Sequence, residues 1–144
     1  MMQPKPLIFL DFDGVLHPTS AKPQQWFSCA DLLAEVLQGM QCEIVISSSW
    51  RFSHSLAELK ELLPISLAER VVAATGAAHI GKFARYTEIQ SFVGSRPNLR
   101  WMPLDDCAWD FPKTSQLIAC NPNSGMTRVE AEKVRQWLGD TVFP

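Results

Sequence analysis

Two acidic pairs have the residue type and spacing to do chemistry. Asp11 and Asp13 are separated by one residue and directly follow the apolar run 7–10, and Asp105 and Asp106 directly follow a second apolar run. Close carboxylates repel one another unless a cation or hydrogen-bond donors lie between them. A site made of a few carboxylates and waters suits Mg²⁺. The two pairs therefore predict a Mg²⁺ site, provided that the fold brings them together.

A phosphate ligand would need donors and positive charge, and the sequence offers both. Ser47, Ser48 and Ser49 end another apolar run, where a hydroxyl can donate to a phosphate oxygen or cap a helix. The segment 82–100 holds four basic residues against one acid, a local excess of +3, although the formal net charge of the chain is -2. That mild overall charge excludes a global basic field for non-specific nucleic-acid binding.

A parallel sheet is expected to position these residues. Five apolar runs of strand length alternate with segments of helical period, which is typical of α/β proteins built from crossover units. In an open parallel sheet, ligands bind at the carboxyl ends of the strands. Pro103 cannot donate a ladder hydrogen bond, so we expect an edge or an irregular pairing there. We place the strands at 7–10, 43–46, 70–74, 100–104 and 116–119.

Helix boundaries follow from capping residues and helix breakers. A Ser, Thr or Asn at the start with an acid three residues later predicts a helix start, and Gly or Pro predicts its end. The predicted helices are marked by Ser28 with Asp31 before Gly39, by Ser53 before Pro64, by the apolar pattern of 83–93, and by Thr127 with Glu130 before Leu138.

Length and composition fit one folded domain. The chain has 144 residues, 47% hydrophobic and 19% charged, which excludes disorder, collagen-like repeats and coiled coil, and we expect 1–144 to form a single domain. The four cysteines lack zinc-motif spacing and are expected to be free thiols or small core residues. Because the sequence shows neither a signal peptide nor an apolar run of about 18–20 residues, we expect a cytoplasmic protein without a membrane partner.

The ordered motifs resemble those of the haloacid dehalogenase-like (HAD) superfamily of phosphotransferases. Asp11-Phe12-Asp13-Gly14-Val15-Leu16, a strand ending in serine, a basic residue and Asp105-Asp106 follow its four motifs in order over nearly the whole chain. More narrowly, 10–18, Ile46-Ser47-Ser48-Ser49-Trp50-Arg51 and Arg85-x-x-Glu88-Ile89 resemble the small capless group found in Swiss-army-knife RNA-repair proteins. The resemblance implies a three-layer α/β/α sandwich around a mainly parallel, five-stranded Rossmann-like sheet without a cap domain.

The resemblance also implies roles for the acids. Asp11 would be the nucleophile that forms an aspartyl-phosphate, and Asp13 would protonate the leaving oxygen and then activate water. Mg²⁺ would be held by Asp11, the backbone carbonyl of Asp13 and Asp106, with Asp105 or Asp110 assisting through water. The fourth motif can be read as the pair Asp105-Asp106 or as a D-x-x-x-D pattern from Asp106 to Asp110.

A hydroxyl and a cation would bind the phosphate. We prefer Ser48 as the hydroxyl because, on strand alternation, it shares a face with Ile44 and Ile46. Arg85 is the preferred basic residue, with Lys82 second. Further candidates for contact with the phosphate or the substrate are Gly14, His17, Ser47, Ser49 and Arg51, whereas Trp50 is expected to pack.

The spacing leaves no room for a cap, because about 30 residues separate Asp13 from the second strand and about 55 separate the serines from Asp105. An enzyme without a lid cannot enclose a small metabolite. The expected substrate is therefore a phosphorylated RNA or DNA end or another bulky phosphomonoester, whose bases could stack on Trp26, Phe27 or Trp109. The alternatives are a metal-dependent module that binds phosphorylated nucleic acid or protein without turnover, and a signalling receiver, against which the motif order argues.

Overall fold

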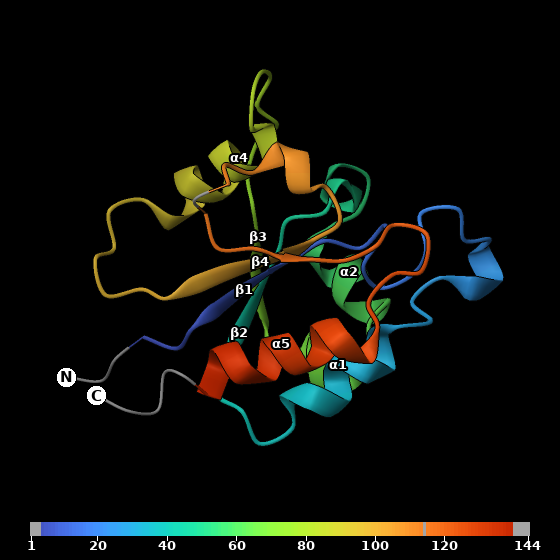
Figure 1. Ribbon diagram of the computed structural model, residues 1–144. Helices are drawn as coiled ribbons and strands as arrows, with labels where there is room; N and C mark the ends of the chain where they lie inside the picture. The colour runs from blue at the N-terminus through green and yellow to red at the C-terminus, as the bar shows by residue number, and fades with distance from the viewer. Residues whose placement is uncertain (1–3, 114, 140–144) are drawn as a thin grey trace.

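The chain folds around one parallel β-sheet. The computed structural model describes residues 4–113 and 115–139 (Figure 1). Five strands lie in the order β3-β2-β1-β4-β5, and all neighbouring pairs are parallel. This arrangement confirms the predicted α/β architecture with a five-stranded Rossmann-like sheet. The strands are β1 (Leu7–Leu10), β2 (Glu43–Ile46), β3 (Val71–Ala74), β4 (Trp101–Asp105) and β5 (Ile118–Ala119).

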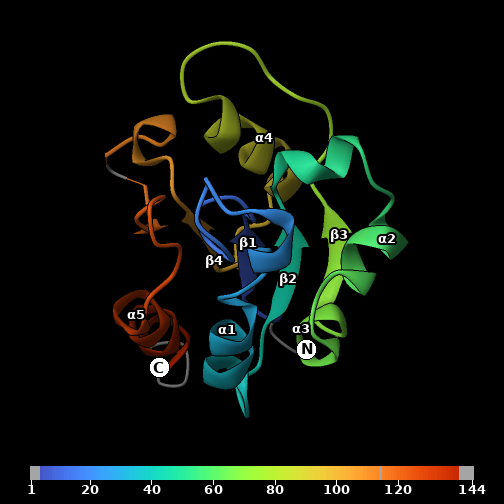
Figure 2. The same ribbon diagram turned by 90° about the vertical axis from the view of Figure 1, so that its right-hand side faces the viewer.

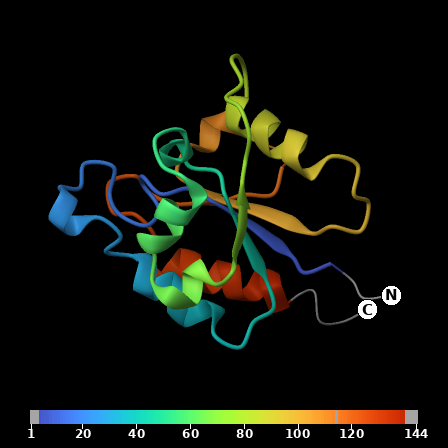
Figure 3. The same ribbon diagram turned by 180° about the vertical axis from the view of Figure 1, so that it is seen from behind.

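Helices cover both faces of the sheet and complete the three layers. Helix α4 lies on one face, whereas α1 and α5 lie side by side on the other, as the three views agree (Figures 1, 2 and 3). Helices α2 and α3 join α1 in the apolar cluster of that second face. The helices are α1 (Ala30–Leu37), α2 (Leu56–Glu61), α3 (Ile65–Ala68), α4 (Ala84–Val93) and α5 (Arg128–Gly139).

Side-chain alternation along the strands divides the core into two clusters. Phe9 and Val45 pack with Ile89 of α4, whereas Ile8 and Ile44 pack in the cluster that contains α1 and α5. Strand β1 is buried on both faces, as its unbroken apolar run predicts. Successive side chains of a strand point to opposite faces, so each strand carries one row of side chains on the α4 face and one row on the face of α1 and α5. The residues that follow a strand continue these two rows.

Strand β4 lies between β1 and β5, but at Pro103 it pairs only with β1, which agrees with the expected edge or irregular pairing at this residue. The carbonyls of Arg100 and Leu104 accept hydrogen bonds from the β1 side, and the carbonyl of Asp105 accepts one from the β5 side. Odd-numbered residues of β4 therefore face β5, which pairs only with Leu104 and Asp105. Strand β5 begins beyond Pro103, so no ladder hydrogen bond is lost at the proline.

Two predicted helix caps are wrong by one or two residues. Helix α1 follows Cys29, which makes no side-chain capping bond, and Ser28 does not cap it. Helix α2 is capped by Ser55 rather than Ser53, and Ser55 forms a reciprocal capping box with Glu58. Ser55 with Glu58 satisfies two backbone donors at once, which is why this serine and not its neighbour sets the start.

The remaining boundaries agree closely with the sequence. The T-x-x-E box is confirmed, because the Val129 N–H donates to Thr127 Oγ1 at 3.3 Å and the Thr127 N–H donates to Glu130 Oε1 at 2.7 Å. Helix α4 matches the prediction for 83–93. Pro64 separates α2 from the short α3, which was not predicted. Strands β3 and β5 begin slightly later than expected.

The predicted lack of a cap domain is confirmed. The segment between Asp13 and β2 holds only the 3₁₀ helix Pro23–Gln25 and α1, and the segment between Ser49 and β4 holds a 3₁₀ turn, α2, α3, β3 and α4. All four cysteines are free thiols, as expected. Within 4–113 and 115–139, no helix has the length and apolarity needed to cross a membrane.

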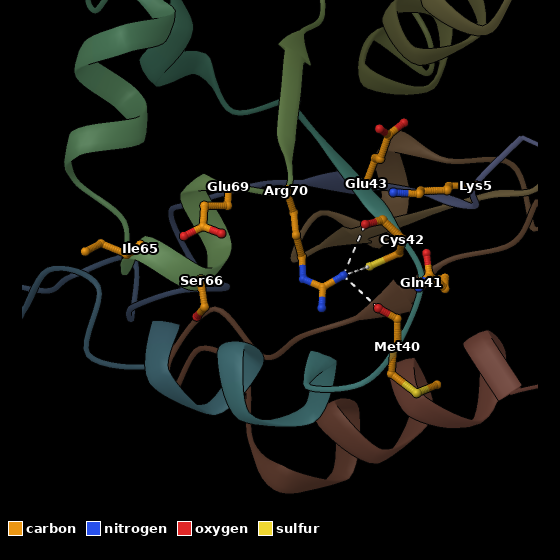
Figure 4. Close-up of a pocket in the computed structure, with 9 residues that line it drawn as sticks. All are labelled: Lys5, Met40, Gln41, Cys42, Glu43, Ile65, Ser66, Glu69 and Arg70. Carbon is orange, nitrogen blue, oxygen red and sulfur yellow. Dashed lines mark hydrogen bonds between the residues drawn. The ribbon is translucent and has the colours of Figure 1, made fainter.

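A cavity of about 600 Å³ lies at the amino ends of β2 and β3 (Figure 4). The predicted site lies at the opposite, carboxyl ends of the strands. The Arg70 guanidinium donates to the carbonyls of Leu37, Met40 and Cys42. These carbonyls belong to the end of α1 and the turn that follows, where helix acceptors lack intrahelical partners. Arg70 therefore fixes the connection from α1 to β2, and the cavity is the space beside this tether.

Candidate active site

Three polar side chains continue one row of the sheet. Phe9 and Val45 point to the α4 face, and Asp11 and Ser47 follow two residues later in the same rows. Asp105 ends β4 in the row that also faces α4, and its side chain is nearly fully buried. The parallel register places these residues at the carboxyl edge of the sheet, which faces the viewer in Figure 2. The structure thus brings both acidic pairs and the serine run to one edge.

Arg85, in the first turn of α4, lies over this row. Its Nη1 is 3.0 Å from Asp105 Oδ2 and 3.4 Å from Asp11 Oδ1. The structure therefore places the preferred basic residue beside the predicted nucleophile. The other cations of the segment 82–100 lie over aromatic rings, so the local excess of +3 is not concentrated at this edge: Lys82 over Phe83, Arg96 over Phe92 and Arg100 over Trp137.

Asp110 fixes the start of α4. Its Oδ2 accepts a hydrogen bond from the Arg85 N–H at 3.2 Å. This N–H is one of the first-turn donors that a helix cannot satisfy itself, and Phe83, at the N-cap position, supplies no capping side chain. Asp110 therefore caps α4 from a neighbouring loop. Of the two readings of the fourth motif, this arrangement favours the Asp105-Asp106 pair over the D-x-x-x-D pattern.

Burial and mutual repulsion raise the pKa of both buried acids. The pKa of Asp11 lies well above its usual value because the carboxyl is buried and close to Asp105, while Arg85 lowers it in part. Burial likewise raises the pKa of Asp105 to about 6, against the opposing effects of Arg85 and the Cys107 N–H, which donates to Asp105 Oδ1 at 3.0 Å. One arginine does not compensate these acids, so additional positive charge would stabilise their ionised forms.

Asp106 lies against the backbone of the first motif. Gly14 has φ +78°, and a Cβ at this position would overlap the Asp106 carboxylate, so only glycine allows the approach. Asp106 also raises the pKa of Asp11 through a hydrogen bond and its charge. Asp105, Asp106 and Cys107 offer ligand atoms within 4.8 Å of one another, but burial raises the Cys107 pKa to about 12 and keeps the thiol protonated. The carboxylates that remain fit a hard cation such as Mg²⁺.

Asp13 lies in different surroundings from Asp11. Its side chain is 44% exposed, and His17 Nε2 lies 2.8 Å from its Oδ1. The Trp50 indole N–H donates to its Oδ2 at 3.1 Å. His17, a candidate for substrate contact, and Trp50, expected only to pack, therefore both hold Asp13, one on each oxygen.

Phe27 fixes the His17 ring. The Phe27 N–H donates to His17 Nδ1 at 3.0 Å, so Nδ1 carries the lone pair and Nε2 carries the hydrogen directed at Asp13. The φ of Phe27 is +64°, which is uncommon for a residue other than glycine. Its ring packs edge-on against Phe12, His17 and Trp50. The backbone and ring of Phe27 thus set both the tautomer and the position of the histidine.

The structure favours Ser47 over Ser48 as the phosphate-binding hydroxyl. Ser47 Oγ and Thr75 Oγ1 are buried without a hydrogen-bond partner in the described part of the chain. Such hydroxyls have lost their hydrogen bonds to water, and a ligand can restore them. The preference for Ser48 assumed the face of Ile44 and Ile46, but Asp11 and Arg85 lie on the opposite face.

Ser48 and Ser49 serve the turn that follows β2. Ser48 Oγ accepts the Trp50 N–H at 3.2 Å and so caps the 3₁₀ helix Ser49–Phe52. Ser49 is exposed at the start of that helix. A phosphate contact by either serine stays a prediction. Ser48 contributes to the site by orienting the turn that carries Trp50.

Arg51 tethers the serine turn to neighbouring segments. Its guanidinium donates to the carbonyls of Ser47, Ser48 and Gly76 and, at 2.8 Å, to Glu88 Oε1. Its side chain is only 4% exposed. Because these bonds occupy the guanidinium, a phosphate contact by Arg51 stays a prediction that this arrangement does not favour.

Sequence reasoning missed the roles of three residues that shape the site. Thr75 ends β3 in the row of Ser47, and the strand-end rule could have found it. Glu88 was noted only as part of a motif, yet it is buried, accepts a hydrogen bond from Arg51 and forms an ion pair with Arg85 Nε at 3.7 Å. Phe27 was named only as a candidate for base stacking, and no local signal marks its hold on His17, which depends on a positive φ and on contacts with distant rings.

Comparison with known proteins identifies the family. Residues 7–131 match the family described as the HAD domain in Swiss Army Knife RNA repair proteins. Neither the curated proteins nor the solved structures gave a match. The matched range contains all five strands and every candidate site residue described above. The chain therefore belongs to the family of HAD domains found in Swiss Army Knife RNA repair proteins.

Proposed function

We propose that this chain is a Mg²⁺-dependent phosphatase that acts through a phosphorylated Asp11. The observation that carries the proposal is the convergence of Asp11 and Asp105 on Arg85 at the strand ends, where Ser47 follows β2 on the same face, with Asp13 held separately by two N–H donors. Membership of the HAD family supports phosphohydrolase chemistry in general. A module that only binds phosphate would have no need of an oriented second carboxylate, so this arrangement favours turnover over binding alone.

The acids at the sheet edge fit a metal site. Asp11, Asp106 and the backbone carbonyl of Asp13 would hold Mg²⁺, with Asp105 behind them. When bound, Mg²⁺ would neutralise charge on the carboxylates and on the phosphate, which otherwise repel each other.

Asp11 and its neighbours would carry the first step. An Asp11 carboxylate oxygen forms a bond to phosphorus while the bond from phosphorus to the leaving oxygen breaks. Arg85, 3.4 Å from Asp11 Oδ1, orients the nucleophile and offers donors to the phosphoryl oxygens. The unpartnered hydroxyls of Ser47 and Thr75 would donate to the same oxygens.

Asp13 would move the protons. It gives a proton to the leaving oxygen in the first step and takes one from water when water attacks the aspartyl-phosphate. His17 and Trp50 hold one carboxylate oxygen each, so the carboxyl keeps one orientation through both steps. Its 44% exposure lets water and the leaving group reach it.

The open edge supports a bulky substrate. No cap covers the carboxyl ends of the strands in the described residues, so a phosphate at the end of a long molecule could reach Asp11. The family is named for RNA repair proteins, which supports a phosphorylated RNA or DNA end as that molecule.

The test is phosphate release by the purified chain with Mg²⁺. We expect release from phosphomonoesters, its loss on chelation of the metal, and a loss of about 1,000-fold or more in Asp11→Asn. Circular dichroism and thermal melting would show that the variant remains folded. Turnover that persists in Asp11→Asn would contradict the mechanism, and phosphate-dependent binding without any hydrolysis would establish the binding module instead.

A further inference from the structure

A cleft of about 280 Å³ lies beside Asp13, outside the group formed by Asp11, Asp105 and Arg85. Three segments of the chain build it: the first motif, the turn after the 3₁₀ helix Pro23–Gln25, and the stretch 49–54. The residues that line the cleft are Asp13, Trp26, Ser49, Trp50, Ser53 and His54.

The walls of this cleft are aromatic and partly open to solvent. The Trp26 and Trp50 rings lie 5.1 Å apart and meet at 79°, and the His54 ring stacks on Trp50 at 5.4 Å and 19°. Trp26 is 42% exposed, so much of its surface is free for a ligand. Flat aromatic surfaces of this kind stack with planar rings.

The polar groups of the cleft suit an uncharged ring with hydrogen-bonding edges. His54 Nδ1 lies near Ser53 Oγ and the Trp50 carbonyl, whereas His54 Nε2 and Ser49 Oγ have no partner within the described residues. The lining, all of it in the described part of the chain, contains neither Lys nor Arg. The cleft therefore does not match a second phosphate, and a polyanionic backbone would find no cation in it.

The position of Asp13 indicates which part of a substrate would enter the cleft. In the proposed reaction Asp13 protonates the leaving oxygen, so the group attached to that oxygen lies on the Asp13 side of the site. Because Asp13 itself lines the cleft, the leaving group is directed into it. In a nucleotide this group is a sugar that carries a base.

We propose that the cleft binds the nucleobase of a nucleoside phosphomonoester, stacked on Trp26, with Ser49 and His54 Nε2 at the edge of the base. This inference rests on the proposed function, because it uses Asp13 as the acid. The same chemistry is present in a mononucleotide and in the phosphorylated terminal nucleotide of an RNA or DNA strand, and both would place an unpaired base next to Asp13.

The test compares substrates with and without a base. For each variant, kcat/KM for 3′- and 5′-adenosine monophosphate is divided by kcat/KM for glycerol phosphate. We expect the wild type to prefer a nucleotide, and this ratio to fall about 5- to 100-fold in Trp26→Ala, in line with the loss of one stacked base. Trp26→Phe keeps a ring and should restore most of the ratio. Phe52→Ala is the matched control, because Phe52 is an aromatic residue that is 56% exposed and does not line the cleft.

Several results would overturn the inference while the phosphatase activity stands. These are equal kcat/KM for glycerol phosphate and both nucleotides, an unchanged ratio in Trp26→Ala, or a phosphopeptide hydrolysed better than any nucleotide. An oligonucleotide that ends in the same phosphorylated nucleotide distinguishes binding of a free mononucleotide from binding of a strand end. A higher kcat/KM than the mononucleotide assigns the cleft to strand ends, and a lower one assigns it to free nucleotides.

A different result marks failure of the proposed function. If no phosphomonoester is hydrolysed, the cleft is tested by calorimetric titration of adenosine monophosphate into Asp11→Asn and into the double variant with Trp26→Ala. Weaker binding by the double variant supports the cleft as a base site, and equal binding overturns it.

Discussion

The two aspartates of the first motif are one residue apart in sequence but lie in contrasting environments. Asp11 is buried beside Asp105 and Arg85, and its pKa is raised by that burial and by the neighbouring acids. Asp13 is 44% exposed, is held by the neutral N–H groups of His17 and Trp50, and borders an aromatic cleft. One carboxylate thus lies among charges and the other among aromatic rings.

This difference matches the two roles that the proposed reaction requires. A nucleophile needs positive charge around it to be ionised and to approach a phosphate, and Asp11 has as neighbours Arg85 and the acids that would hold Mg²⁺. An acid and base needs access to water and a fixed orientation, which Asp13 has. Pairs of titratable groups in contrasting environments commonly divide nucleophilic and proton-transfer work in this way.

The largest expected effect separates the two aspartates directly. Asp11→Asn should lose about 1,000-fold or more of the turnover with every leaving group, because no phosphoenzyme can form. Asp13→Asn should lose about 100- to 10,000-fold with an alkyl phosphate, whose leaving oxygen needs a proton. With nitrophenyl phosphate, Asp13→Asn should instead give a stoichiometric burst and accumulate phosphoenzyme, measured by stopped-flow absorbance and intact mass. A burst in Asp11→Asn, or the lack of a burst in Asp13→Asn, would contradict the assignment of Asp11 as nucleophile and Asp13 as acid and base.

The second prediction concerns Asp106 as a Mg²⁺ ligand beside Asp11. Gly14→Ala places a methyl group on the Asp106 carboxylate and should weaken Mg²⁺ binding about 10- to 100-fold, measured by calorimetry or by the Mg²⁺ dependence of turnover. Gly39→Ala is the matched control, because Gly39 has φ +77° with open space around it. Both variants carry a backbone cost of about 1 kcal/mol. Equal Mg²⁺ affinity in the two variants would show that Asp106 does not hold the metal.

The third prediction concerns the donors on Asp13. Trp50→Phe keeps a ring but removes the indole N–H from Asp13 Oδ2, and kcat should fall about tenfold with an alkyl phosphate, as for one lost hydrogen bond to a charged group. The loss should largely disappear when Asp13→Asn is already present, because the tryptophan acts through that carboxylate. Trp137→Phe should not change kcat, because Trp137 lies on α5 and its indole N–H has no partner within the described residues. Additive losses in the double variant would assign Trp50 another role.

The smallest effect is on stability and depends on pH. Burial raises the pKa of Asp105 to about 6, so between pH 4 and 6 the native state keeps a proton that the unfolded chain has lost. Through this group the metal-free protein becomes less stable as pH rises across that window. Mg²⁺ competes with the proton, so a fixed Mg²⁺ concentration of ten times the Kd at pH 7.5 should raise Tm by about 5 °C at pH 7.5 and by less at pH 5.5. The same Tm rise at both pH values would contradict Asp105 as part of the metal site, and Asp105→Asn should reduce the pH dependence.

The strands, their polar ends and the order of the motifs can be predicted from local patterns in the sequence. A run such as 7–10 followed by an acid is a local pattern, and chain direction alone places that acid at the carboxyl edge of a parallel sheet. The lack of a cap also followed from chain length between motifs, because the predicted helices and strands already use those residues. These features are one-dimensional, so they can be read without coordinates.

Which side chains meet depends on long-range packing. The choice of Ser47 over Ser48 depends on which face of the sheet α4 covers, and strand periodicity alone gives two equivalent faces. The tethering by Arg51 and the capping by Asp110 depend on carbonyl and N–H groups that are distant in sequence. The hold of Phe27 on His17, and so on Asp13, requires a positive φ and a cluster of rings from separate segments. Local patterns set where a polar residue lies along the chain, but long-range packing sets the direction in which it points.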